Sequence, residues 1–327
     1  MKIAFFSTQP YDRQYFDKYN QNHQLVYFDV SLQPDTAELA SGSDAICVFV
    51  NDQVNATVVH KLERLGIKLL LLRCAGFNNV DIAAANAAGI KTARVPEYSP
   101  YAVAEHTVAL ILTLNRKTHK AYNRVRDGNF SLVNLLGFDL HGKTVGVVGM
   151  GKIGQCFAKN MLGFGCRILA FDLIANPELE NADLKFVPLD ELFSNSDIIS
   201  LHCPLNEKTK HLVNKESIKT MKTGVMIVNT GRGALIDTSA VIEGLKSGHI
   251  GNLALDVYEQ EDKLFFRDLS ADIISDDQIM RLMSFPNVLI TAHQAFFTDE
   301  ALTKIAQVTF QNIADYEAGR LGPTLVQ

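Results

Sequence analysis

The feature that most constrains the fold of this chain is a glycine-rich turn between a predicted strand and a predicted helix. An apolar run leads into Gly149-x-Gly151-x-x-Gly154, and a helical pattern begins at once. In such a turn the first glycine permits a tight bend, the second lets the backbone approach a pyrophosphate, and the third lets helix and strand pack closely. The next strand, Arg167–Phe171, ends in Asp172, which is placed to accept hydrogen bonds from an adenosine ribose. These features together predict a dinucleotide-binding βαβ unit, and the alternative is a glycine-rich turn in another α/β protein.

The rest of the chain alternates short apolar strands with helical patterns, which is typical of parallel, doubly wound sheets. In the first part, the predicted strands are Lys2–Ser7, Leu25–Val30, Ala45–Val50, Leu69–Cys74 and Lys91–Val95. Helices are predicted between them at Asp12–Asn20, Asn55–Leu65 and Asp81–Ala88. In the second part, the predicted strands are Thr144–Val148, Arg167–Phe171, Ile198–His202, Val225–Asn229, Leu253–Asp256 and Val288–Thr291.

A length of 327 residues favours two domains. Pro96 interrupts the first alternation, and the apolar helix predicted at Tyr101–Thr118 is too long for an ordinary crossover, so we interpret it as a link. A last helical pattern, Asp299–Ala318, follows the second sheet and is expected to return to the first domain. The predicted fold is therefore two doubly wound parallel-sheet α/β domains. A Rossmann cofactor domain, residues 100–294, is inserted in a flavodoxin-like substrate domain built from residues 1–99 and 295–327.

Composition argues against several classes of protein. The net charge is −5 without a basic run, so no nucleic-acid partner is expected. No apolar run reaches the length of a membrane span, and the N-terminus is too short and too soon polar for a signal peptide. The five cysteines are scattered without a CxxC pair, which indicates a reducing compartment, and we expect a cytoplasmic location. No His, Cys or Asp spacing resembles a metal site, so no metal is expected.

Polar residues follow three of the predicted strands of the second domain. Arg232, Glu261 and His293 come after successive strands, and ligands of open α/β sheets bind at such strand ends. A histidine can supply a proton, a nearby carboxylate favours the imidazolium, and an arginine can bind a carboxylate and polarise a carbonyl. Taken singly, Arg232 could be a surface charge, Glu261 a solvated acid and His293 a core histidine. Their convergence beside a hydride carrier instead favours the reduction of a 2-oxo acid.

The order of these motifs resembles the D-2-hydroxyacid dehydrogenase family over essentially the whole chain. The N-terminal half contributes Arg73-Cys74-Ala75-Gly76-Phe77-Asn78-Asn79-Val80-Asp81 and Val95-Pro96-x-Tyr98-Ser99-Pro100-x-Ala102-Val103-Ala104-Glu105-His106. Within the family, the bacterial fermentative D-lactate branch is most similar, on the strength of Phe130-Ser131-Leu132, Leu264-Phe265-Phe266 and His293-Gln294-Ala295-Phe296. Two positions depart from the family pattern. Ala292 stands where a proline is common, and Lys208-Thr209-Lys210 lacks a frequent cofactor-binding asparagine.

The resemblance implies a role for each site residue. Arg232 would bind the substrate carboxylate and carbonyl, His293 would exchange the proton, and Glu261 would hold the imidazole. The substrate contacts it implies are the N–H groups of Ala75 and Gly76, Tyr98 closing over the substrate, and Phe296 narrowing the pocket. The NAD contacts it implies are Val103, Gly149, Gly151, Lys152, Ile153, Gly154, Asp172, Cys203, Pro204, Thr230, Gly231 and Asp256.

The resemblance implies an enzyme that closes two domains over NADH and pyruvate and forms D-lactate. NAD is expected to be preferred over NADP, because Asp172 repels a 2′-phosphate. One alternative is a dehydrogenase of another D-2-hydroxy acid, such as phenyllactate, a branched-chain hydroxy acid or glycerate. Another is a non-catalytic NAD(H)-sensing protein that resembles the corepressors of the wider family. The apolar helix at Tyr101–Thr118 is expected to pair across a two-fold axis, giving a homodimer or homotetramer.

Overall fold

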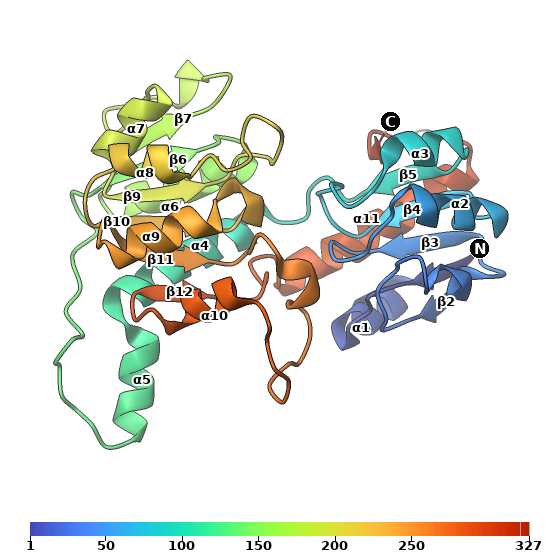
Figure 1. The fold of residues 1–327 in the computed structure, drawn as a ribbon. Helices are drawn as coiled ribbons and strands as arrows, with labels where there is room; N and C mark the ends of the chain where they lie inside the picture. Colours follow the sequence, from blue (N-terminus) through green and yellow to red (C-terminus); the bar gives the residue numbers. More distant parts are fainter. Residues whose placement is uncertain (321, 327) are drawn as a thin grey trace. The chain divides into compact units, whose positions relative to one another are not determined.

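The computed structural model describes residues 1–320 and 322–326, and the chain divides into two compact units (Figure 1). The first unit combines Met1–Ser99 with the C-terminal segment that begins at Phe297, and the second unit is Pro100–Phe296. The first unit is therefore discontinuous in sequence, and the second is inserted in it.

The first unit contains a six-stranded sheet in the order β13-β5-β4-β3-β1-β2. Its strands are β1 (Lys2–Phe5), β2 (Gln24–Tyr27), β3 (Ala45–Val48), β4 (Leu69–Leu72), β5 (Lys91–Arg94) and β13 (Leu325–Val326). The first five are parallel in the doubly wound order 2-1-3-4-5, whereas β13 runs antiparallel to β5. Every residue of β3 and β4 is buried, because helices cover both faces of this sheet.

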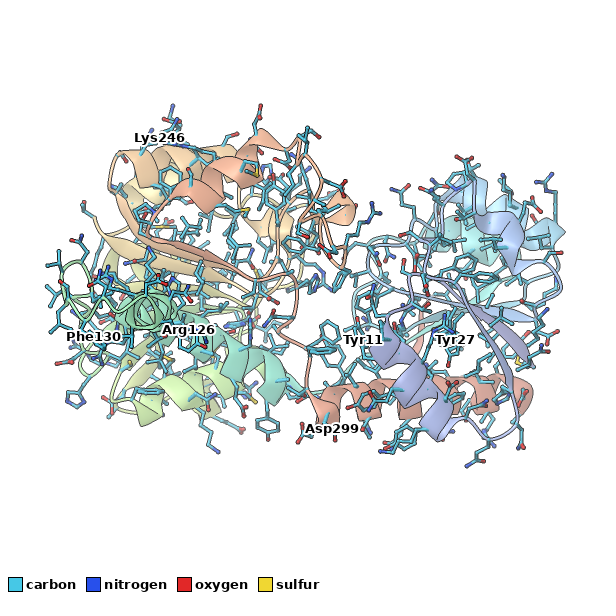
Figure 2. All side chains as sticks on the ribbon, turned by 90° about the horizontal axis from the view of Figure 1, so that it is seen from below. Tyr11, Tyr27, Arg126, Phe130, Lys246 and Asp299 are labelled. Carbon is cyan, nitrogen blue, oxygen red and sulfur yellow. The ribbon has the colours of Figure 1, made fainter. Side chains whose placement is uncertain are left out.

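The helices of the first unit are α1 (Pro10–Tyr19), α2 (Ala56–Arg64), α3 (Ile82–Ala87) and α11 (Asp299–Glu317), with a short 3-10 turn at Ala37–Ala40. Helix α1 packs against α11 although the two are far apart in sequence. At this contact Tyr15 donates a hydrogen bond of 2.6 Å to Asp299, and the ring of Tyr11 meets that of Phe297 edge to face. Figure 2 labels Tyr11 of α1 and Asp299 of α11. The C-terminal helix thus completes the core that the first 99 residues begin.

The second unit contains a seven-stranded, entirely parallel sheet in the order β12-β11-β10-β9-β6-β7-β8. Its strands are β6 (Thr144–Val148), β7 (Arg167–Phe171), β8 (Leu184–Phe186), β9 (Ile198–Leu201), β10 (Val225–Asn229), β11 (Ile250–Leu255) and β12 (Val288–Ile290). Its helices are α4 (Pro100–Arg116), α5 (Thr118–Arg126), α6 (Lys152–Gly163), α7 (Leu189–Asn195), α8 (Lys215–Thr220), α9 (Thr238–Lys246) and α10 (Asp277–Ser284). Three 3-10 turns complete it, at Pro177–Leu179, Gly233–Leu235 and Glu261–Lys263. Numbered within the unit, the strands run 3-2-1-4-5-6 with one further edge strand, which is the strand order of a Rossmann fold, the fold predicted for this domain.

The strand register aligns the carboxyl ends of this sheet. One row of paired residues crosses it, consisting of Phe171, Val148, Leu201, Asn229, Leu255 and Ile290. The residues immediately beyond that row are Asp172, Gly149, His202, Thr230, Asp256 and Thr291. Most of the predicted site residues therefore follow a single edge of the sheet.

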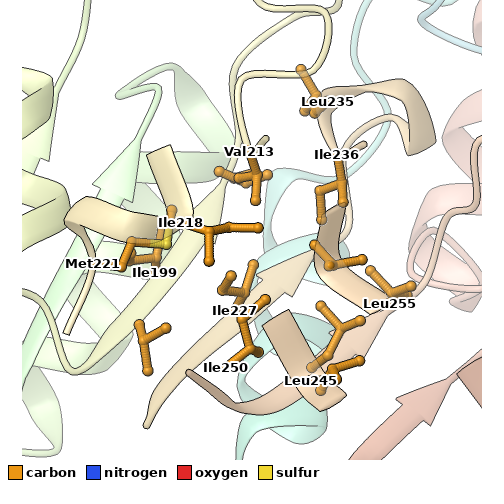
Figure 3. Packing of buried hydrophobic residues seen from close by; sticks show 14 of the residues in the cluster. Ile199, Val213, Ile218, Met221, Ile227, Leu235, Ile236, Leu245, Ile250 and Leu255 are labelled. Atoms are coloured by element: carbon orange, nitrogen blue, oxygen red, sulfur yellow. The ribbon is translucent and has the colours of Figure 1, made fainter. Parts of the chain in front are cut away.

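Two apolar clusters cover the two faces of this sheet, because alternate residues of each strand point to opposite sides. Ile199 and Ile227 belong to the cluster beneath α8 and α9 (Figure 3). Their neighbours Ile198 and Met226 belong to the cluster beneath α4 and α6. Both faces are thus filled, which explains why these strands read as nearly continuous apolar runs.

Helix α4, which we interpreted as a link between domains, begins at the first residue of the second unit. It lies within the second unit, packs against α6, and buries Leu110, Ile111 and Leu114 in the unit's own core. It ends at Arg116, because Lys117 adopts a left-handed backbone with φ of 53° before α5 begins. In the described part of the chain, no helix has the length and apolar character needed to cross a bilayer.

Candidate active site

The glycine-rich turn has the geometry that its sequence predicts. Gly149 has a φ of 97°, and a Cβ there would lie 2.6 Å from the backbone nitrogen of Cys203. A Cβ on Gly154 would lie 1.9 Å from the carbonyl oxygen of Gly149, so only glycine allows α6 to approach the turn. A Cβ on Gly151 would meet no protein atom within 4 Å, so the open side of the turn can receive a ligand. These three positions fit a bound pyrophosphate.

Helix α6 begins at Lys152, immediately after this turn, without a side-chain cap at Gly151. The first N–H groups of a helix lack intrahelical partners and carry the positive end of its dipole, so they favour phosphate oxygens. Asp172 lies against the same turn, where its carboxylate accepts a 2.7 Å hydrogen bond from the N–H of Met150. Turn, helix start and carboxylate therefore form one site suited to the adenosine side of a dinucleotide.

Further predicted cofactor residues lie at the ends of β9 and β10. The Thr107 hydroxyl bonds that of Thr230 at 2.9 Å and the carbonyl of Val103 at 2.7 Å, which joins the start of α4 to the end of β10. Cys203 packs on Gly149, and burial raises the pKa of its thiol to about 11, so the thiol stays protonated near neutral pH. Pro204 follows in an exposed position.

Arg232 lies in the turn after β10. The fully buried Asn229 fixes this turn, because its amide donates to the carbonyl of Arg232 at 2.8 Å and accepts from Gly231 at 3.0 Å. The Arg232 guanidinium donates to the carbonyl of Gly231 at 2.7 Å. No carboxylate pairs with it among residues 1–320 and 322–326, so its other N–H groups are available to an anion. A Cβ on Gly233 would lie 2.1 Å from the backbone of Tyr258, so this turn packs closely on the loop that leads to Glu261.

His293 and Glu261 form a hydrogen-bonded pair. The imidazole Nδ1 lies 2.7 Å from Glu261 Oε1, and the two side chains are 13% and 16% exposed. The other carboxylate oxygen accepts from the Tyr258 N–H at 2.8 Å, which fixes the orientation of the acid. Because an ionised carboxylate only accepts, Nδ1 carries a proton. Nε2 has no hydrogen-bond partner within the described chain, so it is available to a substrate.

Asp256 anchors the loop that carries His293. Its carboxylate is fully buried and accepts from the Thr291 hydroxyl and from the N–H groups of Gln294 and Ala295, at 2.9 and 2.8 Å. His106 Nε2 of α4 lies 3.3 Å from the same carboxylate. Burial favours the neutral acid, but these donors together outweigh it and hold the pKa of Asp256 below its ordinary value. The anchoring roles of His106 and Thr291 were not predicted, because only the folded chain brings them to Asp256.

The predicted carboxylate-binding N–H groups lie in the first unit, in the loop after β4. Three successive backbone carbonyls of this loop accept hydrogen bonds. Cys74 O accepts from Val95 N–H at 3.2 Å, Ala75 O from Arg94 Nη1 at 2.7 Å, and Gly76 O from Cys74 Sγ at 3.2 Å. The N–H groups of Ala75, Gly76 and Phe77 have no partner in the described residues. Each N–H points opposite to the carbonyl of its own peptide group, so none of the three faces the partner of that carbonyl. Successive backbone N–H groups can bind an anion, and we call these three N–H groups the nest.

The predicted site residues are thus divided between the units. Arg232, Glu261 and His293 follow neighbouring strands of the second unit, and Ala75, Gly76 and Tyr98 lie in the first. Phe296 is the last residue of the second unit and is buried. Within the described chain, no group of three or more His, Cys, Asp or Glu side chains could hold a metal ion.

Comparison with known proteins identifies the relatives of this chain. Residues 108–295 match the family described as "D-isomer specific 2-hydroxyacid dehydrogenase, NAD binding domain". The chain is 53% identical over 321 residues to "2-hydroxyacid dehydrogenase A" of Aspergillus oryzae, covering 97% of this chain and 92% of that one. It is 50% identical over 325 residues to the "D-lactate dehydrogenase" of Escherichia coli, covering 99% of each. The solved apo-structure of D-lactate dehydrogenase from Escherichia coli aligns over 100% of both chains with a TM-score of 0.90 and 48% identity.

Proposed function

The chain belongs to the NAD-dependent D-isomer specific 2-hydroxyacid dehydrogenases, and we propose that within this family it reduces pyruvate to D-lactate. The observation that carries the proposal is the His293–Glu261 pair, 2.7 Å apart, with the opposite nitrogen of the imidazole unpartnered in the described chain. An imidazolium held in this way is a proton donor suited to carbonyl reduction near neutral pH.

The glycine turn, the start of α6 and Asp172 would hold NADH, together with Val103, Cys203, Pro204, Thr230 and Gly231. When bound, NADH supplies the hydride that the carbonyl carbon of the 2-oxo acid accepts. Arg232 binds the substrate carboxylate and polarises the carbonyl, while His293 Nε2 delivers the proton to the carbonyl oxygen. Glu261 stabilises the imidazolium before the transfer, and the N–H nest at Ala75–Phe77 gives the carboxylate a second set of donors.

Pyruvate is proposed as the substrate on two grounds. The aromatic side chains of Tyr98 and Phe296 would leave room for only a small substituent on the 2-oxo acid. The Escherichia coli relative at 50% identity is named for D-lactate, whereas the Aspergillus oryzae relative carries only the general name. Substrate choice within the family is therefore the part of the proposal that most needs a direct test.

The test is NADH oxidation across a panel of 2-oxo acids, with chiral analysis of the product. We expect pyruvate to give the highest kcat/KM and the product to be D-lactate. A higher kcat/KM with phenylpyruvate, a branched 2-oxo acid or hydroxypyruvate would move the chain to another substrate class. Tight NADH binding without turnover of any of them would favour the sensor alternative.

We also propose that the chain forms homo-oligomers, through a surface other than the one that the sequence suggested. The apolar face of α4 is buried in its own unit, whereas α5 and the segment after it carry exposed apolar side chains, of which Phe130 is labelled in Figure 2. They are Tyr122, Val125, Phe130, Leu132, Val133 and Leu136, each at least 49% exposed. Such a patch is typical of protein interfaces. Light scattering should report a dimer or larger species, and Phe130→Ser combined with Leu132→Ser should shift it toward the monomer.

The five cysteines are unpaired thiols, which fits a reducing environment, and we propose a cytoplasmic location on that basis.

A further inference from the structure

The orientation of the N–H groups in the nest after β4 depends on the hydrogen bonds that the carbonyls of the same peptide groups accept. The strongest of the three contacts is the one from Arg94, because its guanidinium is charged and lies only 2.7 Å from the carbonyl oxygen of Ala75. That carbonyl belongs to the same peptide group as the N–H of Gly76. A donor on the carbonyl polarises the peptide and makes its N–H a better donor on the other side. The contact from Arg94 therefore strengthens the Gly76 N–H as a donor to an anion.

Arg94 also contacts the far end of the loop. Its guanidinium carbon lies over the ring of Phe77, 5.1 Å from the ring centroid. A single side chain thus touches the first and the last residue of the nest. Rotating the Ala75–Gly76 peptide would break the charged hydrogen bond, so Arg94 favours the orientation in which the N–H groups face a ligand.

The backbone of Arg94 is fixed in turn by the C-terminal part of the chain. Its N–H donates to the carbonyl of Thr324 at 3.0 Å, and its carbonyl accepts from the Asn312 amide at 3.0 Å. The Thr324 hydroxyl donates to the other end of the same amide at 2.6 Å. Asn312 belongs to α11 and is 4% exposed, so these bonds lie in a protected environment. A continuous chain of contacts within the first unit therefore runs from α11 through Arg94 to the nest.

We propose that Arg94 is a positioning residue for the substrate carboxylate, and that Asn312 and Thr324 set its place. This inference deepens the proposed function, since it rests on the nest receiving the carboxylate of a 2-oxo acid. Arg94 does not touch the substrate in this scheme. It orients and polarises the peptides that do.

The first experiment compares Arg94→Met and Arg94→Lys with Lys91→Met, a matched control on an exposed side chain of the same strand. Steady-state kinetics gives kcat and KM for pyruvate, and NADH fluorescence gives its Kd. We expect Arg94→Met to raise the pyruvate KM by about tenfold or more, the scale of a lost charged hydrogen bond. Arg94→Lys should recover part of this loss, and Lys91→Met should match the wild type. The NADH Kd should be unchanged, since the predicted NADH contacts lie in the second unit.

The second experiment separates positioning from general damage to the fold. The methyl ester of pyruvate presents the same carbonyl without a carboxylate anion, so its kcat/KM should fall far less in Arg94→Met than that of pyruvate. Equal losses for acid and ester would overturn the proposal, as would a wild-type pyruvate KM in Arg94→Met. Should Arg94→Met fail to fold, Asn312→Ala and Thr324→Val keep the guanidinium and are expected to raise the pyruvate KM by about two- to fivefold. A wild-type KM in both would then count against the proposal.

The two proposals fail in different ways. A wild-type protein that reduces no 2-oxo acid would remove the proposed function before any variant is made. A wild-type enzyme that is active on pyruvate, with Arg94 variants that bind pyruvate normally, would remove only the role of Arg94.

Discussion

At the scale of single residues, the chain contains two His–Glu pairs that allow a matched comparison. His293 pairs with Glu261 at 2.7 Å in the candidate site, and His211 pairs with Glu259 at 2.6 Å nearby in the same unit. Of the two histidines, only His293 follows β12 at the carboxyl edge of the sheet, in the loop that Asp256 anchors. The two pairs therefore have similar chemistry and different expected functions.

Glu261→Gln should shift the pH profile of pyruvate reduction toward acid and lower kcat, because an amide cannot stabilise the imidazolium as a carboxylate does. Glu259→Gln should leave the profile unchanged. The measurement is kcat and kcat/KM for reduction from about pH 5 to 9, a range that brackets the ordinary histidine pKa. An unshifted profile in Glu261→Gln would remove this residue from the proposed mechanism.

Asp172 is expected to decide the choice between NADH and NADPH, since its carboxylate would repel a 2′-phosphate. Asp172→Ala should lower the preference for NADH by about tenfold or more, which corresponds to about 1.4 kcal/mol. Because the carboxylate also accepts from Met150 N–H, Asp172→Asn is the matched variant that keeps an acceptor for the turn. The ratio of kcat/KM for the two cofactors is the readout, and comparable wild-type use of NADPH would contradict the prediction.

At the scale of elements, one buried arginine joins three parts of the first unit. Arg73 follows β4, is 1% exposed, and donates to the carbonyls of Phe6 and Ser7 after β1. Its guanidinium also pairs with Asp12 of α1 at 3.2 Å. Asp52 lies nearby, and although the Arg73 charge favours its ionised form, burial dominates and raises the pKa of that carboxyl. The guanidinium thus links β1, α1 and β4 beneath the nest-bearing loop.

Arg73→Met should lower the free energy of unfolding by about 3–5 kcal/mol, the scale of a buried ion pair that loses one partner. Arg64→Met, at the exposed end of α2, should change it little. Denaturant titration gives both values. A near-wild-type midpoint for Arg73→Met would show that the buried carboxyls are satisfied without this arginine.

Strands and helices with a strong pattern of apolar residues could be predicted from the sequence. Elements whose position depends on contacts with distant parts of the chain could not. Strands β6, β7 and β10 begin and end where the sequence predicts, because parallel strands buried on both faces read as apolar runs. The edge strands β8 and β13 were not predicted, because β8 carries the charged Lys185 between its two apolar residues and β13 has only two residues. The break between α4 and α5 falls at Lys117, where no glycine or proline marks it. The site residues could be found because parallel strand ends share one edge, whereas the partners of Asp256 depend on contacts across the fold.

At the scale of the whole molecule, a half-buried histidine beside the glycine turn should make stability depend on pH. His202 follows β9, bonds Ser200 at 2.9 Å and packs on Phe157. Burial lowers the pKa of His202 well below its ordinary value, so the folded state favours the neutral ring. Below a pH of about 6.5 the unfolded chain binds this proton and the folded chain does not, so stability is complete above that pH and falls toward acid.

A matched pair of variants should show the contribution of His202 to the pH dependence of stability. His202→Asn should reduce the dependence of the unfolding free energy on pH between about 4 and 6.5, by up to about 1.4 kcal/mol per pH unit. His60→Asn, on an exposed side chain of α2, should not. Chemical denaturation at several pH values tests this, and parallel curves for wild type and His202→Asn would contradict it.

The discontinuous first unit has a consequence for how the protein is made. Strands β1 to β5 are synthesised before the inserted unit, and α11, which buries Ile305 and Ile313, is synthesised after it. The inserted unit has all its strands by Ile290 and can fold on the nascent chain, while the N-terminal sheet still lacks its covering helix. Translation therefore imposes an order in which the nucleotide-binding half is finished first. The sheet of the first unit is therefore expected to stay accessible to chaperones and proteases until α11 has been synthesised.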